Sequence, residues 1–288
     1  MRILLILSFV VLMVQATIIS SKYLTWNFFD DIKSDSIESS YGVLDFDNSK
    51  KKKSGERYGV KFNHKDNSSD IQLYYEKTRT DTTSIIPKDL DVNKYVFKYK
   101  YRYGFLSDNG VTFLYGKVRD NLMKETDGGD VYGVGWNIGQ FSLMQYLIDY
   151  QHFNVYQSDF KFIIGKRIKS FIIGKYINLD SKNSNSFSRN AKSSYFTLGL
   201  KLHTKYNRFN FGAGSFLGKR AFAIMGDGFR IQHHAMEFKS TYMYGVGYSF
   251  NKNLSANLRY IYQKAKELPI NNDNVKVESL FFSILYNF

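Results

Sequence analysis

The chain is built from short stretches in which apolar and polar residues alternate. Between residues 92 and 104, tyrosines and Phe97 occupy every second position, and lysines and Arg102 occupy most of the positions between them. Successive side chains of a β-strand point to opposite faces, so this pattern predicts strands with one apolar and one polar face. We place about fourteen such strands, with twelve as the fallback, at 38–47, 56–65, 69–80, 92–104, 110–119, 130–138, 141–151, 158–167, 169–179, 194–204, 207–216, 236–250, 254–266 and 276–288.

The connections between these stretches differ in length in a regular way. Long segments such as 81–91, 121–129, 180–193 and 217–235 alternate with short turns such as 66–68 and 139–140. An even number of strands brings both ends of the sheet to one side, so all the longer loops fall on the other side. This is the topology of an antiparallel up-and-down barrel with short turns at one end.

The two ends of the chain agree with export to a membrane. The last strand has apolar or aromatic residues at every second position and ends on Phe288, without a polar tail. It resembles the last strand of bacterial outer-membrane β-barrel proteins. The resemblance implies a porin-like transmembrane barrel in the bacterial outer membrane, in which Tyr286 and Phe288 belong to the signal that the assembly machinery recognises.

The first sixteen residues have the features of a signal peptide. Arg2 precedes an apolar run from Ile3 to Val14 and a small-residue cleavage site at Ala16. We therefore expect a signal peptide at 1–16, a periplasmic segment at 17–37 that forms a plug or tether, and the barrel at 38–288. The alternatives are an uncleaved anchor at the start of the chain and an extra strand within 17–37.

Composition narrows the class further. Aromatic residues make up 17% of the chain, which contains two prolines and no cysteine, and this favours strands and excludes disulfides and a lipid-anchored lipoprotein. The mean hydropathy is -0.35 and no further long apolar run occurs, which argues against a helical membrane protein. A soluble β-sandwich also has one apolar face, but it would explain neither the terminal Phe288 nor the alternating loop lengths.

The polar faces carry an excess of positive charge. The whole chain has a formal net charge of +14. The alternation predicts that ten cationic and four acidic side chains point into the lumen. The acidic residues are Asp70, Glu76, Asp149 and Glu237. The cationic residues are Arg57, Lys61, Lys94, Lys98, Lys100, Arg102, Lys161, Lys201, Lys239 and Arg259. Cationic pore linings favour anions, so we expect a weak anion preference. The alternative is that the excess charge lies on rims and loops such as 50–53, where it binds lipopolysaccharide. The basic character does not indicate nucleic-acid binding, because an exported barrel does not meet that partner.

The loop at 217–235 is unusually apolar for an exposed segment. We expect it to fold into the barrel as a constriction, through Phe222, Met225, Asp227, Phe229 and Arg230. The alternative is a loop that packs over the rim or against a neighbour.

An enzyme in such a barrel needs a catalytic group at its outer rim. Of the five histidines, only His152 is expected there, near Asp149 and Asn154, and no phospholipase-like segment accompanies it. The adjacent His233 and His234 lack the further ligands of a metal site. We therefore predict no enzyme activity, metal or cofactor. The sequence favours passive diffusion of small hydrophilic solutes through a porin-like channel. The alternatives are a structural or adhesive barrel and a rim hydrolase.

Overall fold

The computed structural model describes residues 34–86, 88–103, 109–122, 126–165, 167–181 and 191–288. These residues form a closed antiparallel barrel of fourteen strands, in which each strand pairs with its neighbours along the chain and the first pairs with the last. This confirms the predicted architecture and strand number. The expected signal peptide at 1–16, and the segment up to residue 33, lie outside the described residues.

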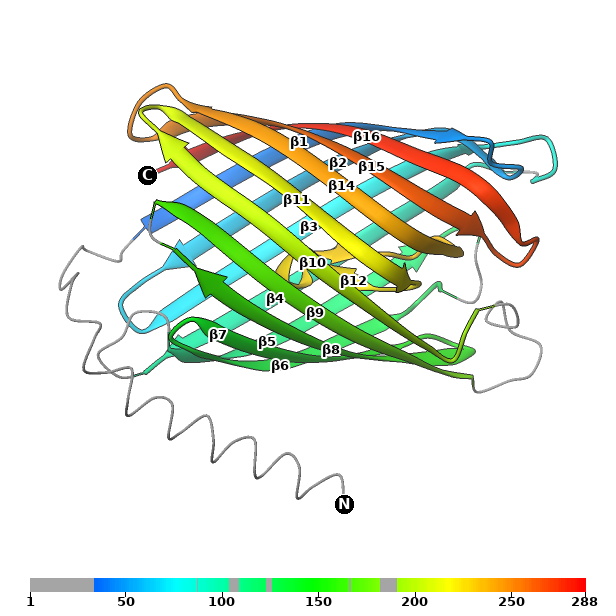
Figure 1. The fold of residues 1–288 in the computed structure, drawn as a ribbon, viewed down its shortest axis with the longest axis horizontal. Helices are drawn as coiled ribbons and strands as arrows, with labels where there is room; N and C mark the ends of the chain where they lie inside the picture. Colours follow the sequence, from blue (N-terminus) through cyan, green and yellow to red (C-terminus); the bar gives the residue numbers. More distant parts are fainter. Residues whose placement is uncertain (1–33, 87, 104–108, 123–125, 166, 182–190) are drawn as a thin grey trace, which may run out of the picture.

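The barrel is built from long strands that run obliquely around it (Figure 1). They are β1 (Ser34–Asp47), β2 (Lys52–Lys65), β3 (Ser69–Thr82), β4 (Leu90–Arg102), β5 (Gly110–Asp120), β6 (Asp130–Ile138), β7 (Phe141–Asp149), β8 (Phe153–Ile164), β9 (Ile168–Ser181), β10 (Ser194–Tyr206), β11 (Phe209–Arg220), β14 (Met236–Ser249), β15 (Leu254–Glu267) and β16 (Asn272–Asn287). The barrel thus begins at Ser34, four residues before the predicted boundary.

Both ends of the described chain lie at one end of the barrel, which we call the inner end. The Phe288 amide donates to the Asp35 carbonyl oxygen at 3.0 Å, beside the turns at 66–68, 139–140 and 207–208. The opposite end, called the outer end, carries the connections 83–89, 121–129, 182–193 and 221–235. Three connections expected to be long are short there, at 48–51, 150–152 and 268–271, because the strands continue past the segments in which apolar residues alternate.

The outward face of the barrel is apolar and aromatic. Cross-strand tyrosine pairs occur near the outer end, such as Tyr41 with Tyr58, whose ring centroids are 5.1 Å apart. The Tyr58 hydroxyl donates to Glu56 at 2.7 Å, and the Tyr115 hydroxyl donates to Asp130 at 2.9 Å. Tyrosine rings that meet carboxylates in this way mark the boundary between the lipid core and water. Among the described residues, no helix is long and apolar enough to cross a membrane.

The hydrophobic core lies inside the barrel. The connection between β11 and β14 turns back into the lumen and forms a small hairpin, β12 (Ile224–Met225) and β13 (Arg230–Ile231), which Figure 1 shows within the ring of strands. We call residues 221–235 the lumen hairpin. Its apolar side chains are buried together with the lumen-facing side chains of β4 to β10, including Val92, Leu114, Ile148 and Ile177.

Candidate functional site

The tip of the lumen hairpin is a tight turn of small residues. Gly226, Asp227 and Gly228 have φ angles of 60°, 57° and 106°, a conformation that glycine adopts without strain and that aspartate tolerates. A Cβ atom on Gly228 would lie 2.2 Å from Leu114 Cδ1 of the barrel wall. The Gly-Asp-Gly sequence therefore permits both the turn and its close approach to β5.

Polar side chains of the wall hold the backbone of the lumen hairpin. Gln157 on β8 donates through Nε2 to the Ile224 carbonyl oxygen at 2.7 Å and accepts through Oε1 from the Ile224 amide at 2.8 Å. Lys175 on β9 donates to the same carbonyl at 3.0 Å and forms an ion pair with Asp159. Gln157, Lys175 and Ile224 are buried, so these hydrogen bonds fix the position of the hairpin in the lumen.

Two lysines of the wall bind the tip. Lys161 Nζ lies 2.9 Å from Asp227 Oδ1, and Lys98 Nζ lies 3.0 Å from the Asp227 carbonyl oxygen. Enclosure by the wall would raise the pKa of the Asp227 carboxyl, but Lys161, Lys98 and Lys201 outweigh that effect and hold this pKa below its usual value. The Asp227 side chain is 63% exposed to the lumen, so water screens these charges.

The outer end of the lumen is packed. Among the described residues, each barrel strand has a lumen-facing residue near its outer end that is at most 7% exposed. From β1 onward these residues are Phe46, Lys52, Thr80, Leu90, Val118, Val131, Ile148, Phe153, Leu179, Tyr195, Arg220, Met236, Glu267 and Val275. The lumen hairpin supplies the side chains that fill the space between them, so the described residues close the outer half of the barrel.

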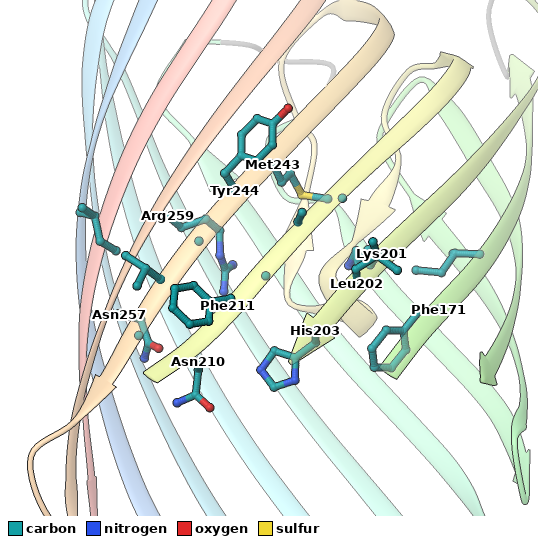
Figure 2. A pocket seen from close by; sticks show the side chains of 18 of the residues that line it. Phe171, Lys201, Leu202, His203, Asn210, Phe211, Met243, Tyr244, Asn257 and Arg259 are labelled. Carbon is teal, nitrogen blue, oxygen red and sulfur yellow. The ribbon is translucent and has the colours of Figure 1, made fainter. Parts of the chain in front are cut away.

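The inner half of the lumen contains cavities with polar and charged walls. A cavity of about 370 Å³ is lined on its lumen side by Lys161, Lys201 and Arg259, together with Asn210 and Asn257, and it extends between the strands to outward-facing side chains such as Phe211 and Tyr244 (Figure 2). A second cavity, of about 330 Å³, runs between the lumen hairpin and the wall formed by β11, β14, β15, β16, β1 and β2, and it reaches Arg220 near the outer end of β11. The space available to a solute therefore lies below the hairpin and beside it.

Comparisons with known proteins identify the fold. No protein-family model matches the sequence, and no curated protein matches it. Among solved structures, the chain is similar to the TodX deltaS2S3 mutant monoaromatic hydrocarbon channel, with a TM-score of 0.53 and 8% identity over 90% of this chain and 91% of that one. It also matches the KdgM porin, with a TM-score of 0.42 and 10% identity over 88% of this chain and 99% of that one. The chain has the fold of a porin-like outer-membrane β-barrel. Its closed ladder and apolar outer face place it in the bacterial outer membrane.

Six of the ten cations predicted to line the pore of this outer-membrane barrel border cavities and do not pair with Glu76. Lys61, Lys161, Lys201 and Arg259 line the two larger cavities, and Lys98 and Lys100 line a smaller one. Lys61 and Lys98 also approach the lumen hairpin, with Nζ atoms 4.4 and 5.3 Å from the ring centroid of Phe229. Lys100 lines the smaller cavity beside Lys98 and Asp70.

Three other predicted cations form structural contacts in the lumen. Arg57 and Lys94 both pair with the buried Glu76, from which Lys94 Nζ lies at 2.8 Å. Arg102 is 8% exposed, donates to the Ser69 carbonyl oxygen at 3.1 Å, and thereby holds the turn between β2 and β3. These side chains face inward, but their donors are engaged in the wall.

Two predicted positions need correction. A β-bulge between Phe238 and Ser240 interrupts the alternation of β14, so Phe238 takes the lumen-facing position and Lys239 pairs near the outer rim with Asp273, at 3.4 Å. Asp149 lies on the outward face of β7, because the buried Ile148 faces the lumen. Both faces of β7 are largely apolar, so alternation alone did not define the inward one.

The residues that anchor the hairpin were not among the predicted site residues. Gln157, Asp159 and Lys175 occupy inward positions of β8 and β9. Three polar residues on the inward face opposite an apolar loop were the feature of the sequence that could have predicted these contacts. The predicted site residues also did not include Arg220, which is fully buried beside the hairpin. Of the predicted loop residues, Phe222 and Met225 are buried, while Asp227, Phe229 and Arg230 border the inner cavities.

The histidines do not form a metal site in the part of the chain that is described. No group of three or more His, Cys, Asp or Glu side chains there could hold a metal ion. The rings of His233 and His234 are tilted by 40° to each other, with centroids 4.1 Å apart, in the segment that follows β13. His152 lies in the turn between β7 and β8 at the outer rim.

Proposed function

We propose that the protein is an outer-membrane channel for small hydrophilic solutes, and that the lumen hairpin closes it in the state described. The observation that carries this proposal is the filling of the lumen: cavities of about 370 and 330 Å³ with cationic side chains in their walls lie below and beside the hairpin, and a single connection fills much of the outer half. A barrel of fourteen strands is wider than its own side chains can fill. Displacement of this connection would join the inner cavities to the outside.

The proposed channel has a weak preference for anions. Lys61, Lys161, Lys201 and Arg259 border the inner cavities and Lys98 borders a smaller one, and the facing carboxylates are few, with Asp227 paired to Lys161. A cationic lining concentrates anions through its field and repels cations. The buried ion pairs of Glu76 with Arg57 and Lys94 contribute little to this preference, because they carry only one excess charge.

The decisive test is conductance with and without the lumen hairpin. We would refold the mature chain and a variant in which residues 222–234 are replaced by a short Asn-Gly turn, since β11 and β14 are already neighbours. In planar bilayers under a salt gradient, we expect rare openings of the wild type, large stable steps of the variant, and an anion-leaning reversal potential. A folded variant that never conducts would contradict the channel.

A structural or adhesive barrel is the second candidate. The packed outer half of the lumen favours it, since a filled barrel is rigid and presents closed outer loops. In that case the hairpin-deleted variant would have a lower thermal stability than the wild type. Liposomes that contain this variant would still not take up small solutes in a swelling assay. Selective uptake of small solutes by liposomes that contain the variant would exclude this candidate.

We also propose partners for the outward face. Tyr286 and Phe288 point outward at the inner end with 45% and 62% exposure, where the assembly machinery would recognise them. Lys77 and Lys117 lie outward beside the tyrosines of the outer boundary, where lipopolysaccharide phosphates would meet them.

A further inference from the structure

The 330 Å³ cavity beside the lumen hairpin has a strongly unbalanced lining. Six cationic residues border it and one carboxylate, Glu38, opposes them; the cations are Arg57, Lys61, Lys201, Arg220, Arg230 and Arg259. Arg57 already pairs with Glu76. Among the described residues, Lys61, Lys201, Arg220, Arg230 and Arg259 have no ion-pair partner. We call this space the basic cleft.

Arg220 forms the closed end of the basic cleft. Its side chain is fully buried, and its Cζ atom lies 5.8 and 5.4 Å from the ring centroids of Phe216 and Phe238. Nη2 donates to Thr241 Oγ1, which also accepts from Gln263 Nε2 at 2.9 Å, whereas Nε and Nη1 lack acceptors among the described residues. Buried guanidinium N–H groups without acceptors carry a free-energy cost and usually indicate a missing anion or water.

Two further arginines approach the cleft from different elements. Arg230 belongs to the lumen hairpin and lies with its Cζ atom 5.7 Å from the ring centroid of Phe281 on β16, and Arg259 projects from β15. Guanidinium groups present paired N–H donors that match carboxylate and phosphate oxygens. Arg230 with Arg259, and Arg220 by itself, therefore form two points at which acid groups of one molecule would bind.

We propose that the basic cleft binds a small organic anion that carries at least two carboxylate or phosphate groups. Its volume equals that of about ten waters, at ~30 Å³ each, which fits a metabolite rather than a polymer. One acid group binds Arg230 and Arg259 in the open part, and another supplies acceptors to Arg220 at the closed end. Phe229, Phe281 and Met225 line the cleft between these points and contact the carbon skeleton.

This inference rests on the proposed channel for its biological role, but binding is measurable without conduction. We would titrate citrate into the refolded full-length barrel in detergent by calorimetry at constant ionic strength, with glucose as the uncharged probe. Citrate should bind and glucose should not. Arg230→Gln and Arg259→Gln should each weaken citrate binding about tenfold, the effect of losing one charge-assisted hydrogen bond.

Arg220→Met separates binding from folding. It removes the buried charge but keeps the length of the side chain, and Thr241 retains its hydrogen bond from Gln263. We expect weaker citrate binding without loss of thermal stability. Lys100→Gln is the matched control, because it removes a lumen charge that lines another cavity, and it should change affinity less than about threefold.

Three results would overturn the basic cleft as an anion site. They are no citrate binding at millimolar concentration, an unchanged affinity in all three arginine variants, and an equal loss in Lys100→Gln, which would indicate only a diffuse field. Citrate binding by a barrel that never conducts would refute the channel and leave the site intact. Conduction by a barrel that does not bind citrate would refute the site alone.

Discussion

Replacing Gln157 by leucine should release the lumen hairpin. The side chain is 1% exposed and makes two hydrogen bonds with the backbone of Ile224, at 2.7 and 2.8 Å. Leucine has a similar size and makes neither bond. After the change the Ile224 carbonyl oxygen still accepts from Lys175 at 3.0 Å, but the Ile224 amide is left buried without an acceptor.

These contacts set the size of the effect. A neutral hydrogen bond contributes about 1 kcal/mol net, and a buried donor without an acceptor costs about 1–3 kcal/mol. The docked position of the hairpin should therefore lose about 2–4 kcal/mol, which raises the population of the released state roughly 30- to 1000-fold. The barrel ladder is unaffected, because Gln157 pairs with Tyr146 and Ile177 through its backbone.

Hydrogen exchange resolved by mass spectrometry measures this population directly. Amides of the segment 221–235 should exchange faster in Gln157→Leu by this factor, and openings in planar bilayers should become more frequent. Gln145→Leu is the matched control: Gln145 lies on the same pair of strands but faces outward, where it accepts from the Ser158 hydroxyl at 2.8 Å. Its exchange in 221–235 should equal that of the wild type.

Unchanged exchange in Gln157→Leu would refute the anchoring role of this residue. Faster exchange without more frequent openings would show that the hairpin leaves its site and that the barrel still does not conduct. Hydrogen exchange thus tests the contacts of the hairpin, and conductance tests the function proposed for it.

Three further predictions concern charge and assembly. Asp227→Asn should shift the reversal potential towards anions, because it removes the carboxylate that neutralises Lys161; an unchanged potential would place Asp227 outside the ion path. Lys98→Gln should shift the reversal potential towards cations. Arg102→Gln should lower the free energy of unfolding by about 1–3 kcal/mol and leave the reversal potential unchanged, because Arg102 holds a turn. Deletion of Phe288 should reduce the amount of folded barrel in cells but not the refolding yield in detergent, and equal losses in both would make its role structural.

The sequence predicted the barrel because its outward face is uniform. Every barrel strand presents apolar or aromatic residues to lipid at alternate positions, as at Tyr41 and Val43 in β1 and at Ile284 and Tyr286 in β16. Closure of the sheet then follows, since a lipid-exposed edge would leave backbone groups without partners. Strand ends were predicted less well, because beyond the lipid core the outward face becomes polar and the lumen-facing side becomes apolar, so the pattern that marks the lipid-facing segments no longer holds.

The interior was predicted less well because a polar lumen was assumed. In the outer half the lumen-facing side is itself apolar, at positions such as Val92, Val118 and Ile148. Apolar residues then occur on both faces of a strand, and the pattern no longer shows which face points inward, as at Asp149. In the sequence, this apolar interior was indicated only by the apolar loop at 217–235. The residues that anchor the loop could not be predicted, because they contact it from strands that are distant in the sequence.

The packing of the lumen hairpin limits how the proposed channel can open. Phe222, Ile224 and Ile231 are at most 1% exposed, and burial of such side chains contributes about 1.5–3 kcal/mol each. Departure of the entire hairpin would re-expose all three at a cost of about 5–9 kcal/mol, so that state would be populated roughly 10³- to 10⁶-fold less than the closed one. A movement of the tip breaks only the contacts of Asp227 and Phe229, which already meet lumen water. Frequent small conductance steps would therefore indicate motion of the tip, and rare large steps would indicate release of the hairpin.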